Sequence, residues 1–254
     1  MGIFHKIEYH QFMKKKRLFT SYLLTLAITQ KTAFAFPTAF VSLDGIAAFA
    51  NTGKTQAIAL FNTLGNTYIP NKEWQNYNSL MLGAGVNTYK NHDIEINTGL
   101  RYLPTIEMPS HGDVLQLHSE RFRNLSYSYN ITSSIWLADN TITWTKHKLQ
   151  PGLIFGIGAA LNKTSNYHEE PLNDHTAPSL APFVNNHNTT FAYELGAALD
   201  YAFDKFIIEC AYRSLNAGQT QLGLSSLQNT ENHLSTGTLY YNIISLGVRY
   251  HHDI

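Results

Sequence analysis

The chain has 254 residues, with 18 basic and 18 acidic side chains and a single cysteine. Charged residues make up only 14% of it, where about 25% is usual for a soluble domain. One cysteine excludes an intramolecular disulfide framework, and a formal net charge of zero gives no basic surface for nucleic acid.

The N-terminus carries the three parts of a secretory signal peptide. Four basic residues, Lys14 to Arg17, precede a short apolar stretch from Leu18 to Thr29, and an Ala-x-Ala cleavage site follows at residues 33–35. The apolar stretch is shorter than the roughly 20 residues that a membrane-spanning helix needs. We therefore predict a cleaved signal peptide and an exported protein.

The boundaries that follow are residues 1–35 for the signal peptide and 36–254 for one exported domain. Residues 1–12 are interpreted as an upstream mis-start, with Met13 as the initiator. Removing six of the 18 basic and one of the 18 acidic residues leaves 12 and 17, so the exported domain keeps no basic patch.

Eight later segments alternate between bulky apolar and small or polar residues, which is typical of β-strands. They run from 10 to 16 residues. Strands of soluble proteins usually have about 5–6 residues, whereas a tilted membrane-crossing strand needs about 9–11. In chain order they are residues 40–51, 77–89, 94–103, 122–137, 149–162, 191–203, 205–215 and 239–251.

The sixth segment, Phe191–Phe203, shows the pattern most clearly. Phe, Tyr and Leu side chains occupy its odd positions, and Gly, Ala, Glu194 and Asp200 occupy its even ones. We interpret the bulky side as facing lipid, with no protein core behind it. Ten residues are assigned to this lipid-facing surface: Leu80, Leu82, Ile131, Phe155, Ile157, Leu195, Leu199, Ile208, Leu246 and Val248.

The opposite side of each strand then faces a narrow lumen, since eight strands enclose little space. Charged side chains in such a lumen must pair, because an unpaired one costs several kcal/mol. We predict a polar network that plugs the lumen, although a small porin-like channel for water and small solutes stays open as an alternative. Its members are Glu95, Arg101, Glu194, Asp200, Glu209, Arg213 and Arg249.

The connections alternate in length along the chain. Short turns are expected at 90–93, 138–148 and 204–205, and long polar loops at 52–76, 104–121, 163–190 and 216–238. Short turns at one end and long loops at the other are typical of outer-membrane barrels. The long loops would carry any site for a host or envelope ligand. A soluble sandwich or lipocalin-like barrel is the alternative, and the strand lengths disfavour it.

The Gly-rich segments LMLGAGV (80–86), LIFGIGAAL (153–161) and YELGAALDYAF (193–203) and the final NIISLGVRY (242–250) resemble one family. This is the small bacterial outer-membrane β-barrel family typified by the transmembrane domain of outer membrane protein A. The resemblance covers nearly all of residues 36–254. It implies an eight-stranded antiparallel up-and-down transmembrane β-barrel in a Gram-negative outer membrane, surrounded by lipid. It also implies recognition of a C-terminal aromatic residue by the barrel assembly machinery; here Tyr250 is followed by four further residues.

Three further motifs bear on the function of the chain. The sequence NTGKT (51–55) lacks the first glycine of a phosphate-binding loop, because Ala48 stands there. Glu231, His233 and Ser235 allow a second alternative, a lipid-modifying barrel enzyme, but their loop setting offers no oxyanion donor. The loop histidines show no metal-ligand spacing. We therefore expect a structural or surface-interaction protein rather than an enzyme, without a cofactor or metal and with no nucleic-acid partner.

Overall fold

The computed structural model describes residues 38–61, 64–173, 183–226 and 232–253. These residues are almost entirely β-strand. The predicted signal peptide lies outside the described residues. None of the described segments forms a helix with the length and hydropathy needed to cross a membrane.

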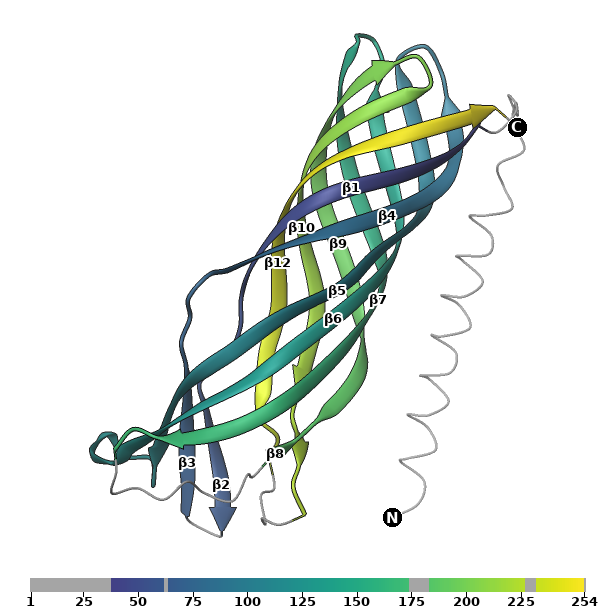
Figure 1. Cartoon of the computed structure of the whole chain (residues 1–254). Coiled ribbons are helices and arrows are strands. Elements are labelled where there is room, and N and C mark those ends of the chain that lie inside the picture. The colour runs from purple at the N-terminus through teal and green to yellow at the C-terminus, as the bar shows by residue number, and fades with distance from the viewer. Residues whose placement is uncertain (1–37, 62–63, 174–182, 227–231, 254) are drawn as a thin grey trace, which may run out of the picture. The chain divides into compact units, whose positions relative to one another are not determined.

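Eight long strands close into one antiparallel barrel (Figure 1). Each pairs with its neighbour in the chain order of these eight, and the pairing of the first with the last closes the ring, for example Gly45 opposite Leu246. The predicted eight-stranded antiparallel barrel is thus confirmed. The wall strands are β1 (Thr38–Asn51), β4 (Gln75–Lys90), β5 (Ile94–Gln116), β6 (Arg123–Trp144), β7 (Leu149–Pro171), β9 (Asn186–Phe203), β10 (Phe206–Gln221) and β12 (Ser235–Asp253).

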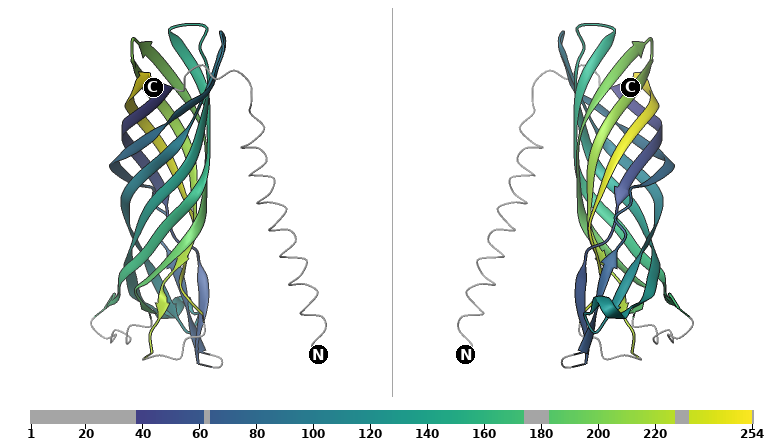
Figure 2. Two further views of the ribbon diagram at one scale, coloured as in Figure 1. Left: turned by 90° about the vertical axis from the view of Figure 1, so that its right-hand side faces the viewer. Right: turned by 90° about the vertical axis from the view of Figure 1, so that its left-hand side faces the viewer.

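Short turns lie at the end of the barrel where β1 begins and β12 ends (Figure 2). They comprise residues 91–93, 145–148 and 204–205. The predicted turn at 138–148 was too long, because β6 keeps its alternation as far as Trp144. We call this the turn end and the opposite one the loop end.

The four long loops were predicted too long, because wall strands continue into each of these ranges. β5 continues to Gln116 and β7 to Pro171, so several strands are far longer than a membrane crossing requires. Short elements fill much of the rest: β2 (Gln56–Phe61), β3 (Leu64–Pro70), the 3₁₀ turn η1 (Glu120–Phe122), β8 (Phe183–Val184) and β11 (Gly223–Leu224).

The hairpin β2–β3 takes the place of β1 and β4 in the wall near the loop end. Strand β3 pairs with β5 from Pro70 opposite Gly112 onward. On the other side, the Gln56 amide donates to the carbonyl of Ser235 at 2.7 Å and accepts from its N–H at 3.1 Å. One side-chain amide therefore joins the hairpin to β12 as a backbone bridge would.

Replacing Gln56 with Ala is expected to loosen the hairpin without unfolding the barrel. The substitution removes both hydrogen bonds to Ser235, each of which contributes about 1 kcal/mol. Limited proteolysis should cut between residues 52 and 74 several times faster in the variant. Lys54→Ala is the control, since Lys54 is exposed two residues away. Equal cleavage rates in both variants would show that Gln56 does not hold the hairpin.

The interior changes character along the barrel. In the half next to the short turns, which we call the turn-side half, inward side chains are mostly polar or charged. In the loop-side half most of them are apolar and form one cluster that includes Ile46, Met108, Leu125, Ile135 and Tyr241. The outer face changes in the opposite sense, because β6 shows Trp136, Ile142 and Trp144 in the turn-side half and only Ser, Asn and Thr from Ser134 to Asn124 in the loop-side half. The loop-side half is therefore built like a water-soluble barrel.

Ile131, one of the ten residues predicted to face lipid, lies in the loop-side half, where apolar side chains point inward. Its side chain is fully buried, so its assignment to the lipid-facing surface was wrong. Strand β6 alternates evenly from Ile131 to Thr143, and Asp139 fixes the interior phase. The apolar residues at odd-numbered positions of β6 from Leu125 to Ile135 thus pack inside the loop-side half.

Burial in this apolar core also affects the tyrosines of the loop-side half. Desolvation raises the pKa of Tyr129 to about 12, so its phenol stays neutral. Tyr241 donates its hydroxyl to Ser133 Oγ at 3.0 Å, which satisfies the one polar atom it carries into the core.

Candidate functional site

The outer surface of the turn-side half is a continuous apolar belt. The remaining nine residues predicted to face lipid all lie on it, with 41–64% of each residue exposed. Aromatic side chains border it on both sides: Tyr102 stacks on Trp136 at 4.2 Å between ring centroids toward the loops, and Phe206 contacts Tyr250 at 5.2 Å near the turns. Exposed apolar surface of this extent is stable only against hydrocarbon. The belt therefore marks the membrane-spanning part.

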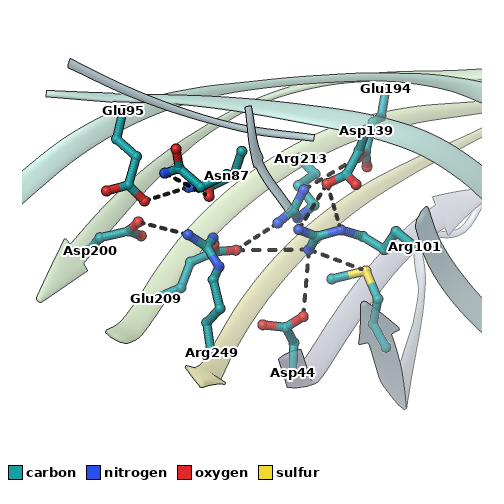
Figure 3. Close-up of polar contacts among 12 residues, drawn as sticks. Asp44, Asn87, Glu95, Arg101, Asp139, Glu194, Asp200, Glu209, Arg213 and Arg249 are labelled. Atoms are coloured by element: carbon teal, nitrogen blue, oxygen red, sulfur yellow. Dashed lines mark hydrogen bonds and ion pairs between the residues drawn. The ribbon is translucent and has the colours of Figure 1, made fainter. Parts of the chain in front are cut away.

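Inside the belt, a charge network crosses the lumen (Figure 3). Glu209 of β10 stands at its centre. It accepts from Arg213 Nη2 at 2.7 Å, pairs closely with Arg249 Nη2, and lies 3.8 Å from Arg101 Nη1. Strands β5, β10 and β12 are thereby joined across the barrel axis through one carboxylate.

Further carboxylates complete the coordination of these guanidinium groups. Arg101 donates from Nε to Asp139 at 3.0 Å and lies 3.5 Å from Asp44. Arg213 donates to Glu194 at 3.3 Å. Because guanidinium groups present donors in a fixed fork, one arginine can hold carboxylates from different strands at once.

The network continues toward the turn end. Arg249 Nη1 lies 3.6 Å from Asp200 Oδ2. Glu95 accepts from Asn97 at 2.9 Å and pairs with Lys90 at 2.9 Å, and Lys90 is exposed. All seven residues predicted for the lumen are buried, with at most 5% of each exposed.

The sequence analysis missed two members, Asp44 and Asp139. Asp139 was placed in a turn because the end of β6 was set too early. For the first predicted strand, residues 40–51, the sequence analysis assigned no residue to either face, although Asp44 lies on the same face as Ser42 and Ile46. In both cases the signal available in the sequence was a single aspartate within an alternating stretch.

Two stacked layers thus fill the barrel interior. The charge network occupies the turn-side half, and the apolar cluster, with Met108, Ile131 and Ile135 each 0% exposed, occupies the loop-side half. Such an arrangement can hold the wall strands together. It leaves these side chains inaccessible to water.

The residues considered for catalysis lie elsewhere. Ser235 is buried, accepts from Gln219 Nε2 at 2.5 Å and donates to the Thr220 carbonyl at 3.4 Å. His233 Nδ1 bonds the Leu222 carbonyl at 2.7 Å, and Glu231 lies outside the described residues. Within the described ranges, no three metal-ligating side chains come together.

No family model and no curated protein matches the chain. Solved structures are similar to it in fold. Neisserial surface protein A is 12% identical, covering 84% of this chain and 96% of its own, with a TM-score of 0.40. The outer membrane protease OmpT of Escherichia coli is 11% identical, covering 88% and 100%, with a TM-score of 0.45. OprG of Pseudomonas aeruginosa is 13% identical, covering 86% and 98%, with a TM-score of 0.39.

At these identities and scores the matches carry no statement about activity, and the fold rests on the strand pairing of the chain itself. A closed ring of eight antiparallel strands with an apolar belt satisfies every backbone group within hydrocarbon, as a membrane requires. The chain is accordingly a transmembrane β-barrel of the kind found in bacterial outer membranes.

Proposed function

We propose that the protein is a closed outer-membrane anchor that holds an elongated protein surface beyond the bilayer for contact with host or envelope components. The belt fixes it in lipid. Past the belt, β6 runs from Ser134 to Arg123, about 35 Å of strand at roughly 3.3 Å per residue. A conducting channel would need no such extension.

The observation that carries this proposal is the pair of filled interior layers. A porin needs a continuous aqueous path, and here such a path would have to pass Glu209 and its three arginines and then the apolar cluster. Moving an ion through the apolar layer carries a large desolvation penalty. These features favour an anchor over the porin-like alternative.

Planar-bilayer recording tests the proposal directly. The detergent-folded protein, verified by a heat-modifiable gel shift, is expected to insert without producing steady channels. A general porin reconstituted in the same lipid serves as the positive control. Reproducible single-channel steps from the folded protein would contradict the closed lumen and favour the porin.

A further inference from the structure

A groove of about 590 Å³ lies on the loop-side half. It forms at the end of β3, where the chain after Pro70 turns away from the paired strand β5 through Asn71 and Lys72. The outer faces of β5, β6 and β7 supply the rest of its lining. A volume of this size is within the range of small-ligand sites, about 300–1,000 Å³.

Two rows of cross-strand neighbours on the outer wall line this groove. His111, Ser128 and His168 face one another in the first row. Hydrogen bonds hold them in place, with Ser128 Oγ 3.0 Å from His168 Nε2 and Asn71 Nδ2 3.4 Å from His111 Nε2. A ligand would therefore meet imidazole, hydroxyl and amide groups that are already positioned.

The second row is Asp113, Ser126 and Glu170. Arg123 pairs with Asp113 at the edge of the groove, and Lys72 adds a second cation. Two basic and two acidic side chains thus balance within the lining. This balance disfavours a strongly charged ligand, and the polar side chains of the two rows disfavour a wholly hydrocarbon one.

The surroundings of the groove have the same chemistry. Outward positions of β6 carry Ser126, Ser128, Asn130, Thr132 and Ser134, with no apolar side chain among them. Ser128 stands eight residues beyond Trp136, about 20 Å above the edge of the belt once strand tilt is allowed for. This level lies outside the hydrocarbon, where the envelope and neighbouring cells present sugars.

We propose that the groove binds a short, weakly charged oligosaccharide. Sugar hydroxyls both donate and accept hydrogen bonds, and the lining offers donors and acceptors side by side in two ordered rows. The proposal rests on the proposed function, since it names the class of partner that the displayed surface would meet.

Isothermal titration of the full chain, folded in a detergent without a sugar head group, tests this binding. One probe is a neutral hexose oligosaccharide from the outer core of lipopolysaccharide, and the other is a neutral N-acetyllactosamine tetrasaccharide of the host type. Binding of either supports the proposal, and the stronger of the two identifies the source. Binding of neither overturns it, while an unaltered absence of conductance would leave the anchor function standing.

Two variants test whether the oligosaccharide binds in the groove. Ser128→Phe should fill it and weaken binding at least tenfold, whereas Thr238→Phe, exposed on the opposite strand β12, should not. Both changes point outward, so the gel shift of folded protein should be retained. Equal affinities of the two variants would overturn the proposal.

The dependence of the binding affinity on salt concentration distinguishes recognition of a sugar from binding of a simple anion. Binding carried by hydrogen bonds should change less than about twofold between 0.05 and 0.5 M NaCl, because screening acts mainly on exposed charges. Loss of more than about tenfold over that range, or displacement of the sugar by inorganic phosphate, would instead assign the groove to an anion and contradict the proposal.

Discussion

Replacing Ile131 with Asp is expected to unfold the loop-side half of the barrel. The side chain is fully buried in the apolar cluster, so the carboxylate would be buried without a partner and a methyl-rich contact would be lost. A buried unpaired charge together with lost core packing costs more than about 4 kcal/mol. The free energy of unfolding, measured by urea titration in detergent, should fall by at least this amount.

Thr132→Asp is the matched control for this variant. Thr132 is the next residue of β6, and its side chain points outward from the loop-side half. An added surface charge there should leave the free energy of unfolding within about 0.5 kcal/mol of the wild-type value. If Ile131→Asp were as harmless as Thr132→Asp, the inward phase of β6 would be wrong.

Arg213→Ala is expected to have the second large effect. Arg213 is fully buried between Glu194 and Glu209, and its loss would leave both carboxylates short of a partner. Among the described buried residues of the turn-side half, six carboxylates already surround three arginines. Breaking a buried pair of this kind costs about 3–5 kcal/mol. The thermal unfolding temperature in detergent should drop accordingly.

Two further variants separate charge from packing at this position. Arg213→Met keeps most of the side-chain volume, so it should lose nearly as much stability as Arg213→Ala if the missing charge is the cause. Arg123→Ala breaks the exposed pair with Asp113 and should change the unfolding temperature much less. An unchanged melting curve for Arg213→Ala would mean that the network does not hold the strands together.

The sequence was sufficient to predict the fold and most of the lumen. In Phe191–Phe203, Glu194 and Asp200 fix the interior side, and the chain there is surrounded by lipid along its whole length. The same alternation in β6 was assigned to the wrong faces. An alternation with a period of two shows that successive side chains point to opposite faces of a strand. It does not show which face contacts water and which contacts lipid. The stretch from Leu125 to Ser134 lies beyond the belt, where water contacts the outer face and the apolar side chains point inward.

The prediction of four long loops was wrong for a related reason. Residues such as Ser165 and Asn188 look like loop residues because a strand with a polar outer face resembles a polar connection. The hairpin β2–β3 and its single amide link through Gln56 depend on contacts across 179 residues of sequence. Local pattern carries no information about such a contact.

At the level of Tyr102 and Trp136 the outer face of the wall changes from apolar to polar. This change also determines how deeply the molecule lies in its bilayer. Sliding toward the turns would bring the Ser- and Asn-covered part of β6 into acyl chains, and sliding the other way would expose Leu195 and Leu246 to water. Either displacement is opposed by the transfer free energy of a whole ring of side chains. The height at which the groove stands above the lipid is consequently set by the covalent sequence of the wall.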